Sequence, residues 1–188
     1  MEGARIGENC KIFPGAVISA IPQDLKFNGE DSVVEIGNET TIRECSTINR
    51  GTSVTGKTII GENCLVMAYS HVAHDCVIGK NCIIVNGVAL AGHVEVGDHA
   101  IIGGNSSVHQ FVTIGKHTMI SGGSLVRKDV PPYVKAAREP LSYIGVNSIG
   151  LRRRGFLEEK ITEIQDIYRI LFQKNNNNTQ AVTKIEAE

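Results

Sequence analysis

The sequence predicts a parallel β-helix built from six-residue repeats. From Ile36 to Val126, every sixth residue is Ile, Leu or Val. Small or β-branched residues recur four positions after these aliphatic residues, and glycine often follows them directly. A period of six fits neither the helical period of 3.6 nor the alternating period of 2. It does fit short strands joined by sharp turns around a narrow interior.

Three strands of six residues make one coil, so residues i and i+18 should lie above one another, about 4.8 Å apart. The same phase is already present from Ile6 to Ile18. It fails at Asp24 and Glu30 and resumes unchanged at Ile36. The polar segment near 21–33 is therefore expected to be a loop ejected from one corner, and such loops often carry function.

The segment 51–58 is Gly- and Thr-rich but stays in phase, so we expect an ordinary coil there. The chain starts inside the repeat without a visible cap, which favours a piece of a longer protein. After Val126 the pattern ends at tandem prolines, Pro131 and Pro132, which cannot continue a strand ladder. The sequence thus predicts a β-helix over 1–133 and a C-terminal helical segment over 134–188.

A helix is expected between Phe156 and Gln173, followed by a polar tail that begins at Asn175. Apolar residues recur at helical spacing in this stretch and should pack against the prism or a neighbouring subunit. They are Leu157, Ile161, Ile164, Ile167, Tyr168 and Leu171.

Composition narrows the possible functions. The formal net charge is -1 and only 5% of residues are aromatic, so nucleic-acid binding is disfavoured. No window resembles a membrane span or the apolar core of a signal peptide, which predicts a cytoplasmic protein. The five cysteines show no CxxC spacing, and four of them occupy the small inward position, so we expect reduced core residues.

All six histidines lie between His71 and His117, within the predicted β-helix. The eighteen-residue rule stacks two adjacent columns, His74–Gly92–Gln110 and Asp75–His93–Phe111. It also places His71 and His109 beside them, so four histidines converge on one edge. A histidine next to an aspartate is a candidate general base. A glycine N–H one coil above could stabilise an oxyanion, a combination typical of acyl transfer to a hydroxyl.

Other readings of the same residues stay open. Three histidines on adjacent coils could instead hold zinc with an open water site. His99 and His117 form a separate column, which we interpret as a structural ladder. A basic window over 127–154 predicts an anionic partner, with Arg153 and Arg154 as a possible phosphate clamp.

Several motifs, in order, resemble the acyl-[acyl-carrier-protein]–UDP-N-acetylglucosamine O-acyltransferase family, which performs the first step of lipid A biosynthesis. They are QDLKF (23–27), HVAHDC (71–76), AGHVEVGDHAIIGG (91–104), VHQF (108–111), DVPPY (129–133) and GLRRRGF (150–156). The resemblance implies a left-handed β-helix, a homotrimer with active sites between subunits, and no cofactor or metal. The chain has fewer N-terminal coils and a shorter C-terminal helical part than is usual in this family.

The resemblance also assigns roles. His74 matches the general base, Asp75 its supporting carboxylate and Gly92 the oxyanion donor. The base would activate the sugar 3-hydroxyl to attack a 3-hydroxyacyl thioester on acyl carrier protein. Substrate-binding positions carry over to Asp24, Lys26, His71, Asn86, His93, His109, Gln110, Asn147, Arg153 and Arg154. The acyl-length region carries over to Met119, Ser121 and Gly122, where a glycine leaves room for a long chain.

Three competing functions remain at this point. One is the N-acyltransferase of the same pathway, which usually carries an N-terminal uridine-binding domain that this sequence lacks. The second is a zinc-dependent hydratase of the same fold. The third is a β-helical scaffold without catalytic activity.

Overall fold

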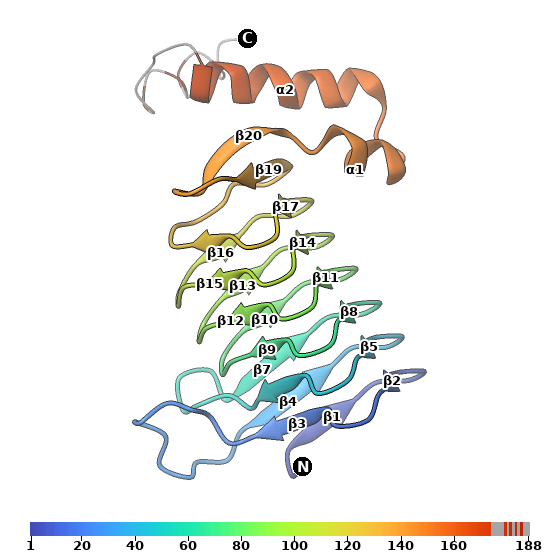
Figure 1. The fold of residues 1–188 in the computed structure, drawn as a ribbon, viewed down its shortest axis with the longest axis vertical. Coiled ribbons are helices and arrows are strands. Elements are labelled where there is room, and N and C mark those ends of the chain that lie inside the picture. The colour runs from blue at the N-terminus through green and yellow to red at the C-terminus, as the bar shows by residue number, and fades with distance from the viewer. Residues whose placement is uncertain (174–178, 180, 182, 184, 186–188) are drawn as a thin grey trace.

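Residues 4–126 wind into a left-handed β-helix, and a hairpin and two helices lie over its last coil (Figure 1). The computed structural model describes residues 1–173 together with residues 179, 181, 183 and 185. Short strands follow one another around a triangular prism, and every third strand joins the same sheet. This architecture confirms the fold that the six-residue repeat predicts.

Each side of the prism is one sheet of parallel strands. The first sheet contains β1 (Ala4–Ile6), β4 (Val33–Ile36), β7 (Lys57–Ile60), β10 (Val77–Ile78), β13 (Glu95–Val96) and β16 (Thr113–Ile114). The second begins with β2 (Lys11–Ile12), β5 (Thr41–Ile42), β8 (Leu65–Val66), β11 (Ile83–Ile84), β14 (Ile101–Ile102) and β17 (Met119–Ile120). The third contains β3 (Val17–Ala20), β6 (Thr47–Asn49), β9 (His71–Val72), β12 (Ala89–Leu90), β15 (Ser107–Val108) and β18 (Leu125–Val126).

Strand pairing fixes the length of each coil. From β7 to β18, each residue pairs with the residue eighteen positions later, as in the ladder that joins Ile60, Ile78, Val96 and Ile114. Earlier coils are longer: Ile36 pairs with Ile60 and Ile6 pairs with Ile36. The insertions are therefore one and two whole hexads, and both leave the repeat phase unchanged. The expected loop near 21–33 is confirmed, because no strand lies between Ala20 and Val33.

The second insertion, residues 51–56, corrects the expectation of an ordinary coil at 51–58. Val54 continues the six-residue pattern but is 71% exposed, so it does not point into the prism. The pattern concealed the insertion because a loop of one hexad keeps every later aliphatic residue in phase. Thus a residue can match the repeat and still lie outside the coil.

Inward-facing side chains fill the prism. Ile60, Ile84 and Ile102 have 1% exposure or less, and the smaller Cys64 and Cys82 alternate with them at the inward corner positions. Removing such aliphatic side chains from water stabilises each coil by about 2 kcal/mol per residue. The cysteines are free thiols, as the sequence predicts.

The ladder continues beyond the tandem prolines, contrary to expectation. β19 (Val134–Ala137) pairs in parallel with β17, and β20 (Ser142–Val146) returns antiparallel to β19. The prolines sit at a corner, where a Cβ on Gly115 would lie 2.4 Å from the Pro132 nitrogen. A corner does not need their missing N–H groups for strand pairing, so the sheet resumes at Val134. The expectation of a wholly helical segment from residue 134 is wrong for residues 134–146.

Two helices follow the hairpin: α1 (Ser148–Arg153) and α2 (Glu158–Gln173). α2 confirms the helix expected over 156–173, although Leu157 precedes it and is 73% exposed. Ile161 and Tyr168 are buried, and the Tyr168 hydroxyl donates to the Pro132 carbonyl at 2.6 Å. α2 is therefore tied to the last coil. Among the described residues, no helix is both long and apolar enough to cross a lipid bilayer.

Three columns of turns form the edges of the prism. The His74 corner comprises residues 73–76, 91–94 and 109–112, between the third and first sheets. The His117 corner comprises residues 79–82, 97–100 and 115–118, between the first and second sheets. The Asn86 corner comprises residues 67–70, 85–88, 103–106 and 121–124, between the second and third sheets.

Candidate active site

Successive turns stack at the His74 corner as the sequence predicts. The His93 N–H donates to the His74 carbonyl at 3.0 Å, and the Phe111 N–H donates to the Gly92 carbonyl at 3.2 Å. The His93 and Phe111 rings stack with centroids 4.6 Å apart. Asp75 and His93 both have positive φ, so the third residue of each four-residue turn takes the left-handed conformation. The two predicted columns are therefore confirmed.

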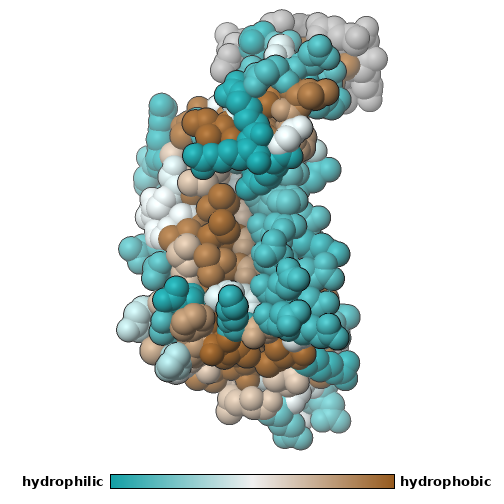
Figure 2. Space-filling view, turned by 90° about the vertical axis from the view of Figure 1, so that its right-hand side faces the viewer, coloured by the Kyte–Doolittle hydropathy of each residue, from teal (hydrophilic) through white to brown (hydrophobic). Residues whose placement is uncertain are grey.

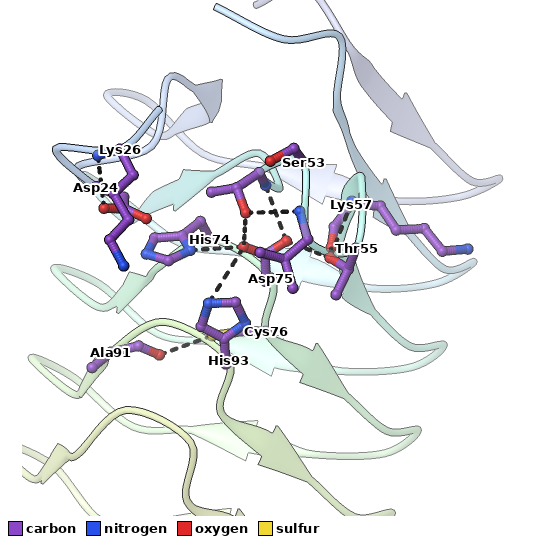
Figure 3. A network of polar contacts seen from close by, with 12 residues as sticks. Asp24, Lys26, Ser53, Thr55, Lys57, His74, Asp75, Cys76, Ala91 and His93 are labelled. Carbon is purple, nitrogen blue, oxygen red and sulfur yellow. Dashed lines mark hydrogen bonds and ion pairs between the residues drawn. The ribbon is translucent and has the colours of Figure 1, made fainter. Parts of the chain in front are cut away.

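A histidine–aspartate pair lies at the centre of this corner (Figure 3). His74 Nδ1 is 2.8 Å from Asp75 Oδ2, and the Asp75 side chain is fully buried. The carboxylate also accepts hydrogen bonds from the Thr52 N–H at 3.0 Å and the Thr52 hydroxyl at 2.7 Å. A further bond comes from the Thr55 hydroxyl. The four donors occupy roughly all the lone-pair positions of one carboxylate.

These contacts determine the protonation of the pair. Burial alone would raise the pKa of Asp75, but hydrogen bonds from Thr55, His74 and Thr52 outweigh it and lower the pKa to about 2. An ionised carboxylate only accepts hydrogen bonds, so His74 must carry its proton on Nδ1. The Nε2 lone pair is then free to accept a proton. The geometry therefore suits a general base.

Gly92 lies against the face of this imidazole. A Cβ built on Gly92 would be 2.6 Å from His74 Nε2 and 2.5 Å from His74 Cε1, closer than real carbon contacts. Among the described residues, no acceptor is found for the Gly92 N–H. The absence of a side chain thus lets the backbone approach the free nitrogen of the base.

Two more histidines surround the pair. The His93 ring meets the His74 ring edge-on with centroids 5.1 Å apart, and its Nε2 is 3.8 Å from Asp75 Oδ2. His71 Nδ1 is hydrogen-bonded to the Thr47 hydroxyl at 2.7 Å. Burial, and to a smaller extent the charge of His74, lowers the pKa of His71 and favours its neutral form. The convergence of His71, His74 and His93 is therefore confirmed.

The remaining predicted residues of this edge are more exposed. His109 Nδ1 lies 3.1 Å from the Gln110 carbonyl, and both side chains face solvent one coil beyond His93. Asp24 and Lys26 lie on the ejected loop, where the Lys26 N–H donates to Asp24 Oδ1 at 3.0 Å. Figure 3 shows this loop on the side toward which the His74 ring points. These residues surround an open polar edge.

Other predicted site residues belong to different corners of this chain. Asn86 and Gly122 lie at the Asn86 corner with Ser121, and Met119 faces outward from the second sheet. Asn147 caps α1, and its amide donates to the His117 carbonyl at 2.9 Å. Within the described chain, they are therefore not brought to His74.

The two arginines also lie at the His117 end of the prism. Arg153 is exposed at the end of α1, whereas Arg154 is half-buried and donates from Nη2 to the His99 carbonyl at 2.9 Å. Burial lowers the pKa of Arg154. The predicted phosphate clamp thus pairs one exposed cation with one that is packed against the ladder.

Sequence reasoning missed Thr52 and Thr55, which donate hydrogen bonds to the Asp75 carboxylate. Both lie in the inserted hexad, where the eighteen-residue rule no longer gives the correct neighbours. The available signal was the pair of glycines, Gly51 and Gly56, around a Thr-rich hexad. The unchanged phase nevertheless predicts an ordinary coil there, so the repeat pattern does not reveal these contacts.

The same corner offers a potential metal-ligand set. Among the described residues, His74, Asp75 and His93 have ligand atoms within 4.8 Å of one another. However, Asp75 already accepts four hydrogen bonds, and one of them comes from His74 itself. A metal would have to displace these donors, so the donor set fits an imidazole base better than a zinc site.

Comparisons with known proteins agree with the repeat fold. Residues 57–92 and 93–128 match the bacterial transferase hexapeptide model, which places the chain among the hexapeptide-repeat proteins. Residues 129–188 match the model for domain 2 of UDP-N-acetylglucosamine O-acyltransferase. The chain belongs to the acyl-[acyl-carrier-protein]–UDP-N-acetylglucosamine O-acyltransferase family.

Similarity to individual members is high. The chain is 63% identical over 172 residues to the Chlorobaculum parvum enzyme, covering 91% of this chain and 65% of that protein. It is 67% identical over 163 residues to the Aquifex aeolicus enzyme, covering 86% of this chain and 62% of that protein. The crystal structure of a Bacteroides fragilis UDP-N-acetylglucosamine acyltransferase superposes with a TM-score of 0.98 at 53% identity, covering 100% of this chain and 74% of that one. The chain thus spans just under two thirds of these curated relatives.

Proposed function

We propose that the protein transfers a 3-hydroxyacyl chain from acyl carrier protein to the 3-hydroxyl of UDP-N-acetylglucosamine, the first step of lipid A biosynthesis. The observation that carries the proposal is the His74–Asp75 pair at 2.8 Å, with the free Nε2 facing Gly92. Membership of the O-acyltransferase family supports this choice of donor and acceptor. We also place this reaction in the cytoplasm, the location that the sequence predicts.

His74 would act first as a base and then as an acid. Nε2 takes the proton of the sugar 3-hydroxyl while that oxygen attacks the thioester carbonyl carbon. The carbonyl oxygen becomes negative, and the Gly92 N–H donates a hydrogen bond to it. The C–S bond then breaks, and the leaving thiolate receives the proton from the imidazolium. Asp75 remains ionised throughout and stabilises that imidazolium.

Binding roles follow from the positions of polar groups around His74. His71, His93 and the exposed Gln110 would contact the nucleotide sugar, with His109 beside them. Asp24 and Lys26 would reach the same substrate from the ejected loop. The Lys26 ammonium can bind a phosphate as a point charge, and the guanidinium of Arg153 or Arg154 can bind one through paired N–H donors.

A homotrimer would complete the site. Figure 2 shows a hydrophobic strip along the second sheet between more polar columns. Its outward side chains are half-buried and uncharged. They are Leu65, Ile83, Ile101 and Met119. An apolar face of this kind favours association with another copy.

Association would also bring the other corners to His74. In one chain, Asn147, Arg153 and Arg154 lie at the His117 end, and Asn86 and Gly122 lie at another corner. A neighbouring copy could supply the two arginines to bind the nucleotide, and Asn86 and Gly122 to accommodate the acyl chain. The lack of a side chain at Gly122 would leave room for a long chain.

Mixed trimers test this arrangement. A chain with His74→Ala is co-expressed with a chain in which Arg153 and Arg154 are both changed to alanine. Each variant alone should be inactive, whereas random mixing should restore about a quarter of the sites by pairing intact residues across subunits. No recovery in verified mixed trimers would contradict a shared site.

An acceptor assay tests the reaction itself. The purified protein is incubated with 3-hydroxyacyl carrier protein and either UDP-N-acetylglucosamine or the corresponding 3-amino sugar, and products are identified by mass spectrometry. We expect an ester on UDP-N-acetylglucosamine, loss of product in His74→Ala, and retention in the ladder variant His99→Ala. A product only with the amino sugar would favour the N-acyltransferase. Stoichiometric zinc with chelator-sensitive activity would favour the hydratase.

A further inference from the structure

The inserted loop 51–56 makes direct contact with the catalytic pair. Its Thr52 donates to Asp75 through both the backbone N–H and the hydroxyl. Its Thr55 hydroxyl approaches Asp75 Oδ1 and also lies 2.9 Å from the Lys57 carbonyl. A hydroxyl carries one proton, and the ionised carboxylate is the stronger acceptor, so that proton belongs to Asp75. Three of the four donors to Asp75 thus come from this loop.

The loop is shaped to reach the carboxylate. Thr52 is 3% exposed, and Gly51 is so close to the next strand that a Cβ would lie 2.2 Å from the Lys57 nitrogen. Gly56 has a φ of +74°, which lets the chain turn back into β7. The hexad therefore leaves the coil and re-enters it directly beside Asp75.

A second contact holds the loop from outside. Glu30, on the ejected segment near 21–33, accepts from the Ser53 N–H at 2.9 Å and from the Asn28 N–H at 2.8 Å. Glu30 therefore joins the loop that carries Asp24 and Lys26 to the loop that carries Thr52. The two insertions form one connected polar assembly around the His74 corner.

We propose that Thr52 and Thr55 are positioning residues for acyl transfer: they hold the Asp75 carboxylate so that His74 keeps its proton on Nδ1 and its lone pair on Nε2. This inference rests on the proposed function for its catalytic consequence. The effect of the two threonines on the protonation of Asp75 and His74 can be measured without any substrate.

The energetic reason is the burial of Asp75. A carboxylate without water is stable as an anion only when its lone pairs are satisfied. Losing the Thr55 hydroxyl leaves Oδ1 with one donor fewer, and losing the Thr52 hydroxyl removes a donor from Oδ2, which also binds His74. With a donor missing, the carboxylate can turn toward His93 Nε2, now 3.8 Å away. His74 would then lose its fixed orientation.

The test compares Thr55→Val and Thr52→Val with the corresponding serine variants and with Ser53→Ala. Valine keeps the shape of threonine but lacks the hydroxyl, and serine restores it. Ser53 uses its backbone N–H, so alanine there is a matched control within the same loop. NMR titration follows the Asp75 carboxyl carbon and the His74 ring nitrogens, and steady-state kinetics follow acyl transfer.

We expect both valine variants to raise the pKa of Asp75 above its value of about 2 and to give His74 a mixture of tautomers. We expect kcat to fall roughly tenfold, with KM for the nucleotide sugar within about twofold. The serine variants should restore both properties. A purely stabilising role would instead lower the melting temperature without changing the titration or the tautomer.

Unchanged NMR titrations in folded Thr55→Val would overturn the inference. Thr55 is exposed at the loop surface, so this variant decides the question even if Thr52→Val does not fold. Altered titrations together with wild-type turnover would also overturn it. If the wild-type protein makes no acylated sugar but the titrations change as expected, the proposed function fails while the control of Asp75 stands.

Discussion

The His74 corner and the His117 corner carry similar ladders of rings on one scaffold. At the first, His93 stacks on Phe111 at 4.6 Å. At the second, His99 stacks on His117 at 4.7 Å and His117 on Tyr133 at 5.5 Å. The stacked histidines take the left-handed conformation at all of these turns. The repeat itself therefore builds histidine ladders, and stacking alone does not indicate chemistry.

The two corners differ in what surrounds the rings. His74 is bonded to a buried carboxylate and faces a glycine. His117 meets Phe156 edge-on, and its Nδ1 is buried without a hydrogen-bond partner among the described residues. Burial, followed by the charges of His99, Arg154 and Lys116, lowers the pKa of His117 to about 4. One imidazole is therefore bonded to a carboxylate, whereas burial and neighbouring charges favour the neutral form of the other.

Breaking the His74 corner at Gly92 should have a larger effect than changes at His117 or Glu30. The methyl group of Gly92→Ala would meet the His74 ring, so we expect the ring to move and kcat to fall about 100-fold. The overpacking should also destabilise the fold by about 1–3 kcal/mol. Kinetics and urea unfolding measure the two effects.

A double variant tests whether the loss of stability in Gly92→Ala comes from the clash with the His74 ring. In a His74→Ala background, the alanine at position 92 has no ring to meet, so its cost in stability should largely disappear. An equal cost in both backgrounds would contradict the close approach of Gly92 to His74.

At the His117 corner, the expected effect is on stability. The pKa of His117 is about 4 in the folded chain, below the ordinary value of 6.5, so the unfolded chain binds the proton first as pH falls. Neutral, buried His117 therefore contributes at most about 3 kcal/mol to the free energy of unfolding above pH 6.5. This contribution is lost as pH falls to 4. His117→Phe should remove that slope in urea unfolding. Asp75, with a folded pKa of about 2 against 3.8, acts only below this window.

The smallest expected effect concerns the link between the two ejected loops. Glu30→Ala removes the acceptor for the Ser53 N–H, so the Thr52 loop should become less ordered. We expect kcat to fall about threefold, because the direct threonine bonds to Asp75 remain. Asp31→Ala, at the exposed neighbouring position, is the matched control. Equal kcat values for the two variants would show that Glu30 does not influence the His74–Asp75 pair.

The sequence predicted the parts that follow a strict period. Six-residue spacing gave the prism, and the eighteen-residue rule correctly joined His74 to Gly92 and Asp75 to His93. These predictions succeeded because each lies between β7 and β18, where every coil has the same length.

Departures from the period could not be predicted in the same way. An insertion of one hexad preserves phase, so the contacts of Thr52 and Thr55 with Asp75 were hidden. The hairpin of β19 and β20 does not follow from the pattern, because tandem prolines usually end a strand ladder, whereas here they occupy a corner. The family resemblance named residues on other corners, such as Asn147, whose approach to His74 depends on a neighbouring copy.

The most direct test of the central claim is the turnover of Asp75→Asn. An asparagine amide can donate to His74 Nδ1, which would move the imidazole proton to Nε2 and remove the base. We expect kcat to fall by about 1000-fold or more, with calorimetric affinity for UDP-N-acetylglucosamine within about threefold of wild type. A folded Asp75→Asn protein with turnover close to wild type would contradict a base held by this carboxylate.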